Sequence, residues 1–265
     1  MSDTVLLERM DAIAVVTLNR PARYNAMNAE MCDAFYEISK ELAADNDLRA
    51  VVVTGAGKAF CSGADLTLLG ELASRGGGDG AHAMLAGFRA LYEALGAVDL
   101  IHAPTIAAIN GACVGGGLGL ALRCDLRVVA EDAKIGASFA TLGVHAGMGI
   151  TGLLPRSLGH EAATEMLLTG ELIRGARAAE LGFSSRCVTT EEVLPVAMEL
   201  AERIAAAAPL AVRSMKRTLM TMTRRDLAMV MELEAPAQVL LAQTEDAQEG
   251  IAARMARRTP KFKGR

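Results

Sequence analysis

A glycine cluster, Gly115-Gly116-Gly117, is the first candidate for chemistry in this sequence. It stands between an apolar run at residues 105–109 and a run of helix-forming residues at 118–122, an order that predicts a strand, a tight loop and the start of a helix. The first N–H groups of a helix have no partners within it, and glycine lets another molecule approach them closely. Such amides favour an oxygen that carries or develops negative charge.

A second loop of small residues, Ser62-Gly63-Ala64, lies beyond the apolar strand predicted at residues 50–54. Two such loops can each offer one backbone N–H to the same oxygen. The alternative is that the glycines only allow a helix to pack closely on a strand.

The composition limits the class of protein. A chain of 265 residues corresponds to one large domain, or to one domain with a small appendage. The net charge of −4 and an aromatic content of 3% argue against a nucleic-acid-binding surface. The five cysteines are scattered and contain no C-x-x-C pair, which predicts free thiols in a reducing cytoplasm and no zinc site.

Two segments without charged residues, 103–122 and 135–155, raise the question of a membrane protein. Glycines, His or Asn residues, or a nearby proline interrupt each of them, whereas a spanning helix needs steady apolarity. The N-terminus shows no basic region followed by an apolar stretch. We therefore expect no membrane span, no signal peptide and a cytoplasmic location.

Local patterns predict the elements that would position the two loops. Residues 5–10 and 12–18 read as a hairpin, and residues 50–54 as a strand covered on both faces. Asn28 is a good N-cap for a helix with apolar residues at helical spacing. Further strands are expected at 126–130 and 135–136, and further helices at 81–98, 193–207, 210–222 and 227–241.

Several longer motifs follow one another along the chain: Asn19-Arg20-Pro21, Asn25-Ala26-Met27-Asn28, residues 59–66, residues 110–117, Cys124-Asp125-Leu126-Arg127, Leu153, Pro155-Arg156, Leu158-Gly159 and residues 257–262. With these motifs the chain resembles the crotonase (enoyl-CoA hydratase/isomerase) superfamily over nearly its whole length. The resemblance implies an α/β fold in which ββα units form a spiral over residues 1–200. It also implies a helical region at 201–265 that mediates assembly into a homotrimer or hexamer.

The resemblance also implies a site. In this family the carbonyl of an acyl-CoA thioester lies between two backbone N–H groups, which correspond here to Ala64 and Gly116. No cofactor is expected to be permanently bound, because coenzyme A arrives as part of the substrate. Arg257 is implied to contact the acyl-CoA, and the alternative is that it is an ordinary solvated residue at a helix end. Contacts with the acyl-CoA are implied for Arg23, Tyr24, Ser62, Ala64, Asp65, Leu66, Val114, Gly115, Gly116, Gly119, Phe139 and Arg257.

The chain departs from the family pattern at the catalytic carboxylates. Hydratases of the family use two glutamates, and Gly119 and Phe139 stand in their places. Hydration needs a base for the water and an acid for Cα, so ordinary hydration of 2-enoyl-CoA should be weak. His145 is a candidate to move a proton at Cα, or else a residue of the pocket wall. Asp65 reads as an acceptor that fixes its loop, with a catalytic base as the alternative.

Two classes of function remain open at this point. The first is a lyase or isomerase that stabilises an enolate, with His145 or a substrate-held water moving protons. The second is a non-catalytic acyl-CoA binding or carrier protein. Turnover of 2-enoyl-CoAs, measured beside their binding, separates the two.

Overall fold

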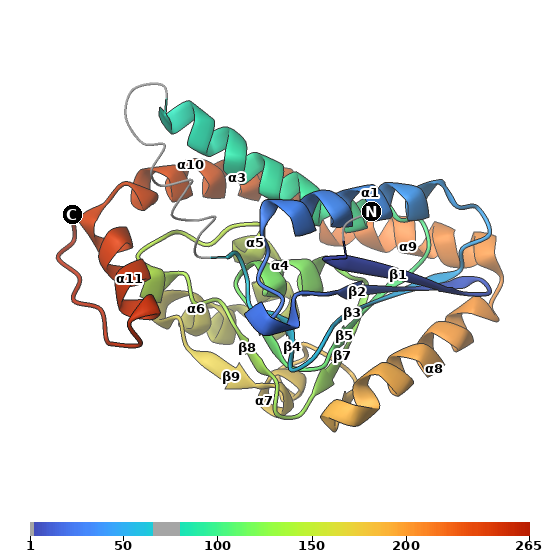
Figure 1. Cartoon of the computed structure of the whole chain (residues 1–265). Helices are drawn as coiled ribbons and strands as arrows, with labels where there is room; N and C mark the ends of the chain where they lie inside the picture. The colour runs from blue at the N-terminus through green and yellow to red at the C-terminus, as the bar shows by residue number, and fades with distance from the viewer. Residues whose placement is uncertain (1–2, 66–79) are drawn as a thin grey trace.

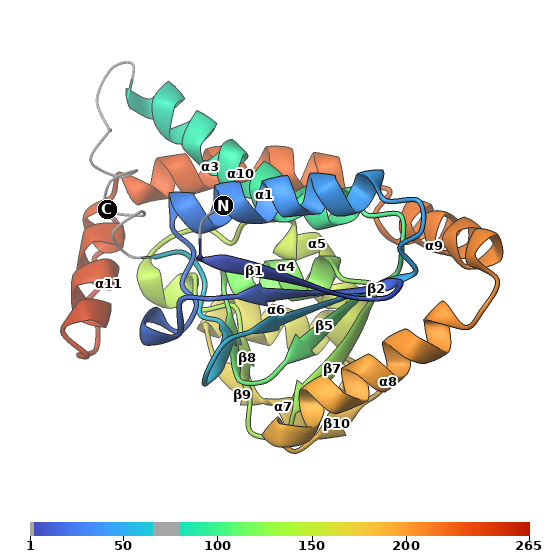
Figure 2. The same cartoon turned by 45° about the vertical axis from the view of Figure 1, so that its right-hand side comes forward.

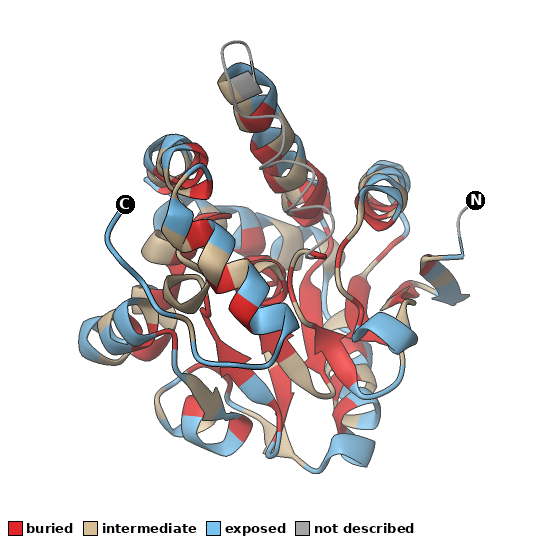
Figure 3. Cartoon of the chain, turned by 60° about the vertical axis from the view of Figure 1, so that its left-hand side comes forward, coloured by how far each residue is buried: buried red, intermediate tan, exposed pale blue. Residues whose placement is uncertain are grey.

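The computed structural model describes residues 3–65 and 80–265 of the chain (Figure 1). The contact expected for Leu66 lies outside these residues. Within them, two sheets form the centre and helices surround it. Figure 3 shows that buried residues gather along the strands and on the inward faces of the helices.

The larger sheet has six strands in the order β1-β2-β3-β5-β7-β10. The first two are antiparallel, which confirms the predicted hairpin, and the others are parallel. All residues of β3 and β5 are buried, as expected for parallel strands covered on both faces. The strands are β1 (Val5–Met10), β2 (Ile13–Leu18), β3 (Ala50–Gly55), β5 (Thr105–Ile109), β7 (Leu126–Ala130) and β10 (Cys187–Val188).

A smaller sheet of four strands was not expected as a unit. The sequence predicts a single loop after each of the strands at 50–54 and 105–109, but a short strand interrupts both loops. Strands of three residues are too short to show an alternating pattern. The order is β4 (Ala59–Cys61), β6 (Ala112–Val114), β8 (Lys134–Gly136) and β9 (Leu172–Arg174), with the first three parallel.

Helix α1 begins where the sequence predicts, after Asn28, whose Oδ1 accepts a hydrogen bond from the Met31 N–H at 3.1 Å. Figures 1 and 2 show α3 and α10 running together along one side of the molecule, and the two helices are in contact. The helices are α1 (Ala29–Ala44), α3 (Gly80–Gly96), α4 (Gly116–Arg123), α5 (Ile150–Leu158), α6 (His160–Thr169), α7 (Gly175–Glu180), α8 (Val193–Ala205), α9 (Pro209–Thr223), α10 (Leu227–Ala242) and α11 (Glu245–Met255).

The division expected between residues 200 and 201 falls inside α8. This helix lies against β2, β3, β5 and β7, so both of its halves belong to the wall of the larger sheet (Figure 2). Helices α9, α10 and α11 follow it. Among the described residues, no helix combines the length and the apolarity that crossing a membrane requires.

Candidate functional site

Three neighbouring parallel strands of the smaller sheet lead to the residues that the sequence singled out. Ala64 follows the carboxyl end of β4, Gly116 follows β6, and Phe139 follows β8. The carboxyl ends of parallel strands meet at one edge of a sheet, where ligands bind in many α/β proteins. All three residues line a cavity of about 630 Å³, a size typical of sites for small molecules.

The backbone amides of Ala64 and Gly116 lie close together across the two loops. A Cβ added to Gly116 would lie 3.7 Å from the Ala64 nitrogen, and a Cβ added to Gly63 would lie 3.4 Å from the Gly116 nitrogen. Gly63 also has a φ of +100°, a conformation that favours glycine. The two amides can therefore reach one small group in the cavity.

Both N–H groups are free of the local backbone pairing. Met27 bridges to the residues on either side of Ala64: its N–H donates to the Gly63 carbonyl and its carbonyl accepts from the Asp65 N–H, each at 2.8 Å. This pattern leaves the N–H of Ala64 outside the bridge. Gly116 is the first residue of α4, so its N–H has no acceptor within that helix. Two donors that face one cavity suit a single oxygen with negative charge.

Close packing explains a third glycine of the cluster. A Cβ on Gly117 would collide with the Cys61 carbonyl, so glycine allows α4 to pack directly on β4. Gly117 is thus a packing residue, whereas Gly115 and Gly116 line the cavity.

Asn25 holds the exposed side of the cavity in place. It has a φ of +54°, which asparagine tolerates better than most residues, and its Oδ1 accepts from the Arg20 N–H at 2.8 Å. Its Nδ2 donates to the Ala59 carbonyl at 2.8 Å, which ties this loop to β4. Arg23 and Tyr24, in the same loop, are exposed and line the cavity.

Asp65 lines the cavity but is paired with a cation. Its carboxylate lies 3.2 Å from the Arg20 guanidinium, and Arg20 also donates to the Ala26 carbonyl. The Arg20–Asp65 pair joins the loop at residues 20–26 to the loop at residues 62–65 on this side of the cavity. This arrangement is the one that a loop-fixing role for Asp65 predicts.

Met148 covers the place where Gly119 was expected to face the substrate. A Cβ on Gly119 would lie 3.0 Å from the Cβ of Met148 and 3.1 Å from its sulfur. Met148, which is 2% exposed, lines the cavity, and Gly119 lies behind it. Phe139 does line the cavity, and its ring lies 3.8 Å from the Cβ position of Gly115. The wall here is therefore apolar.

His145 is half-buried, and the described residues that line the cavity do not include it. Its Nδ1 lies 2.7 Å from the Ala146 carbonyl oxygen, and its own carbonyl accepts from Gln238. Val114 and Arg257 likewise lie outside this lining set, the first buried in β6 and the second exposed after α11. Arg254, one helical turn before Arg257, lines the cavity instead.

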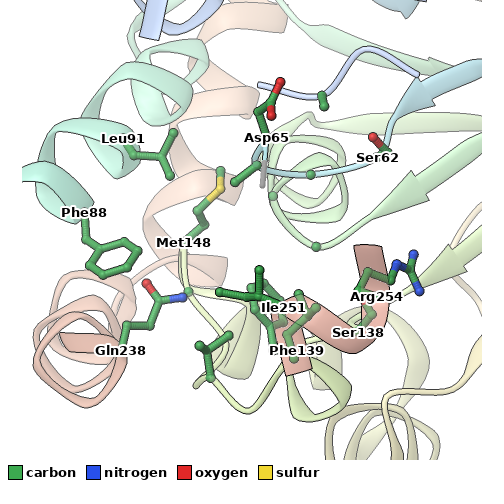
Figure 4. A pocket seen from close by; sticks show the side chains of 18 of the residues that line it. Ser62, Asp65, Phe88, Leu91, Ser138, Phe139, Met148, Gln238, Ile251 and Arg254 are labelled. Atoms are coloured by element: carbon green, nitrogen blue, oxygen red, sulfur yellow. The ribbon is translucent and has the colours of Figure 1, made fainter. Parts of the chain in front are cut away.

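Sequence reasoning missed much of the wall, including four large side chains from separate elements. They come from α3, from the loop before α5, and from α10 and α11, so no local motif joins them. The one available signal is the spacing of aromatic residues on α3, where Phe88 and Tyr92 stand four positions apart. The four are Tyr92, Met148, Gln238 and Arg254, and Figure 4 labels the last three.

Cys61 precedes the first loop, but its thiol is not a nucleophile. It is fully buried, and burial raises its pKa to about 12. A thiol with that pKa is un-ionised near neutrality, and the thiolate is the reactive form.

Comparison with known proteins decides the family. The family model described as enoyl-CoA hydratase/isomerase matches residues 8–265. The chain belongs to the enoyl-CoA hydratase/isomerase family. It is thus a member of the crotonase superfamily, as the motifs indicated.

Known members of the enoyl-CoA hydratase/isomerase family resemble the chain over its length. A putative enoyl-CoA hydratase from Thermus thermophilus is 37% identical over 250 residues, which cover 94% of this chain and 97% of that protein. The 2,3-dehydroadipyl-CoA hydratase of Escherichia coli is 35% identical over 261 residues, covering 98% and 99%. The crystal structure of an enoyl-CoA hydratase/isomerase from Pseudoalteromonas atlantica superposes with a TM-score of 0.86 at 24% identity, covering 98% and 100%. The predicted crotonase fold is confirmed.

Proposed function

We propose that this protein is an enzyme that acts on acyl-CoA thioesters and stabilises an enolate-like oxyanion. The observation that carries the proposal is the approach of the Ala64 and Gly116 amides across the two loops that line the cavity. In this arrangement the two N–H groups donate to the thioester oxygen. Negative charge on that oxygen grows as a proton leaves Cα, so the hydrogen bonds strengthen along the reaction.

Coenzyme A fits the exposed side of the cavity. Arg23 and Tyr24 lie at this side, and Figure 4 shows the guanidinium of Arg254 on the same side of the cavity as Ser62. Guanidinium groups bind phosphates well, which suits the diphosphate of coenzyme A. The CoA portion stays part of the substrate, so the proposal includes no permanently bound cofactor.

We further propose that ordinary hydration of 2-enoyl-CoA is weak in this protein. Met148 and Phe139 give an apolar wall at the two places where the family resemblance implies glutamates. Asp65, the carboxylate of the described wall, is held by Arg20. A proton transfer at Cα then relies on a water held by the substrate, since the His145 side chain lies outside the described wall.

The same apolar wall is the observation that favours the second candidate, an acyl-CoA binding or carrier protein without turnover. An intact pair of amides retains binding even where acid and base are missing. Assays of crotonyl-CoA and longer 2-enoyl-CoAs, run beside binding measurements, separate the candidates. Turnover well above background supports the enzyme, and tight binding without turnover supports the carrier.

The proposed function predicts that acyl-CoA stabilises the folded protein. A ligand that binds only the folded state at one hundred times its Kd adds about 2.7 kcal/mol to the free energy of unfolding. Thermal unfolding with saturating butyryl-CoA should therefore show a raised Tm. Free cysteamine at the same concentration is the control. An unchanged Tm under saturating butyryl-CoA refutes the proposal.

We propose that the chain assembles as a homotrimer or as a dimer of trimers through the helical region 201–265. Helices α9 and α10 present large apolar side chains at helical spacing that are between 59% and 74% exposed in the single chain: Met215, Leu219, Met222, Met229, Leu233 and Leu240. Large apolar side chains exposed in this number favour an interaction site.

Light scattering at micromolar concentration tests this assembly. We expect a mass of three or six chains of 27.7 kDa. Replacing Leu219 and Met222 by lysine should shift the protein toward smaller species, because buried charge opposes association. A wild-type mass of one chain contradicts the proposed assembly.

A cytoplasmic location belongs to the proposal as well. The five cysteines are unpaired, and four of them are buried. Unpaired cysteines are usual in a reducing compartment, where disulfides seldom persist.

A further inference from the structure

A hydrogen-bonded polar pair lies in a mostly apolar part of the cavity. Tyr92 on α3 and Gln238 on α10 are each 6% exposed, and both line the cavity beside Phe88, Leu91 and Met148. The Tyr92 hydroxyl donates to the Gln238 Oε1 at 2.6 Å. In Figure 4, Gln238 lies next to Phe88, and Met148 lies between Gln238 and Asp65.

The hydrogen bonds fix the orientation of the Gln238 amide and leave part of it unused. Its Nε2 donates to the His145 carbonyl at 2.8 Å, so its oxygen must face Tyr92. An amide side chain has two N–H donors and two acceptor sites. Within the described part of the chain, these bonds use one donor and one acceptor site.

The charge nearby selects against an anion. Glu234 is 1% exposed, and its carboxylate accepts from the N–H groups of Gly149 at 2.6 Å and Thr151 at 2.9 Å. Burial, and next the charge of Glu234, raise the pKa of Tyr92. A ligand group beside Tyr92 and Gln238 therefore meets two neutral side chains, and the buried Glu234 lies one helical turn before Gln238 on α10. A neutral oxygen suits this place better than a carboxylate does.

We propose that Gln238, positioned by Tyr92, selects acyl-CoA substrates whose acyl chain carries a neutral oxygen, as a hydroxyl or keto group. The inference rests on the proposed function, which places the thioester carbonyl at Ala64 and Gly116. The acyl chain then runs past Met148 toward Gln238. A buried donor without a partner costs free energy, and an oxygen on the acyl chain provides the partner that an unsubstituted chain lacks.

Calorimetric titration of the wild-type protein tests the inference. The ligands are hexanoyl-CoA, its hydroxy and oxo derivatives at carbons 3 to 6, and adipyl-CoA. At least one hydroxy or oxo derivative should bind about three- to tenfold more tightly than hexanoyl-CoA, the effect of one neutral hydrogen bond, and adipyl-CoA should show no gain. If hexanoyl-CoA binds and no derivative binds more tightly, this inference fails while the proposed function stands. If no CoA thioester binds, both fail.

Tyr92 and Gln238 also contact the loop at residues 145–148. Two variants separate recognition of the ligand from support of this loop. In Gln238→Met, the preference for the oxygenated ligand should disappear, so that its Kd equals that of hexanoyl-CoA in the same variant. Tyr92→Phe keeps the Gln238 amide but releases its orientation, so the preference should fall and not vanish. An equal loss of affinity for both ligands in either variant, with their ratio unchanged, assigns the pair to loop support and overturns the inference.

Discussion

Replacing Gly116 with proline is expected to lower the rate of enolate formation about 10²–10³-fold, the usual effect of losing one oxyanion donor. Proline removes the N–H that Gly116 contributes. It is tolerated as the first residue of a helix, the place that Gly116 holds in α4, so the fold should survive. The measurement is exchange of the Cα protons of butyryl-CoA with D₂O, followed by NMR.

Gly116→Ala is the matched control for this variant. Alanine keeps the N–H but adds a Cβ that would lie 3.4 Å from the Met27 sulfur and 3.7 Å from the Ala64 nitrogen. Its loss of rate therefore measures crowding by a Cβ, and the additional loss in Gly116→Pro measures the missing donor together with the ring carbon that replaces its hydrogen. A proline variant that is folded by its Tm and exchanges protons as fast as the alanine variant contradicts the role of this amide.

The second large effect concerns hydration. We expect the wild-type protein to hydrate crotonyl-CoA at least about 10²-fold more slowly than a relative with both glutamates, because a missing general acid or base costs about 10²–10⁴ each. The measurement is the loss of absorbance of the conjugated thioester at saturating substrate. Hydration at rates usual for the family means that the two-glutamate reasoning does not apply to this chain.

Introducing the two glutamates tests the same explanation by a gain of hydration activity. Gly119→Glu with Phe139→Glu should gain little, because Met148 fills the space beside Gly119. Adding Met148→Ala should raise the hydration rate above that of the double variant. The rise should be modest, since a new glutamate needs supporting hydrogen bonds to hold its geometry. Met148→Ala alone is the control, and an equal rise in that variant contradicts a role for the new carboxylates.

The sequence predicts the local elements of this fold well. The hairpin at the N-terminus and the helix capped by Asn28 depend on neighbouring residues, and both are confirmed. The short strands β4 and β6 escaped prediction because three residues carry too little pattern. Their effect on the site is large, since they bring Ala64 and Gly116 to one edge of a sheet.

The side chains of the wall follow from tertiary contacts that no local pattern encodes. Tyr92 and Gln238 are 146 positions apart, and Met148 meets Gly119 only after the chain has formed β7 and β8 between them. Motifs could indicate that Ala64 and Gly116 line the cavity. They could not indicate that Met148 would cover Gly119, or that Arg254 would line the cavity where Arg257 was expected.

A crystal structure of the wild-type protein with butyryl-CoA tests the central claim most directly. We predict that the thioester oxygen lies about 2.7–3.1 Å from the backbone nitrogens of both Ala64 and Gly116, with the acyl chain beside Met148. Butyryl-CoA bound with its carbonyl away from these two nitrogens, or bound outside this cavity, would contradict the proposed oxyanion site.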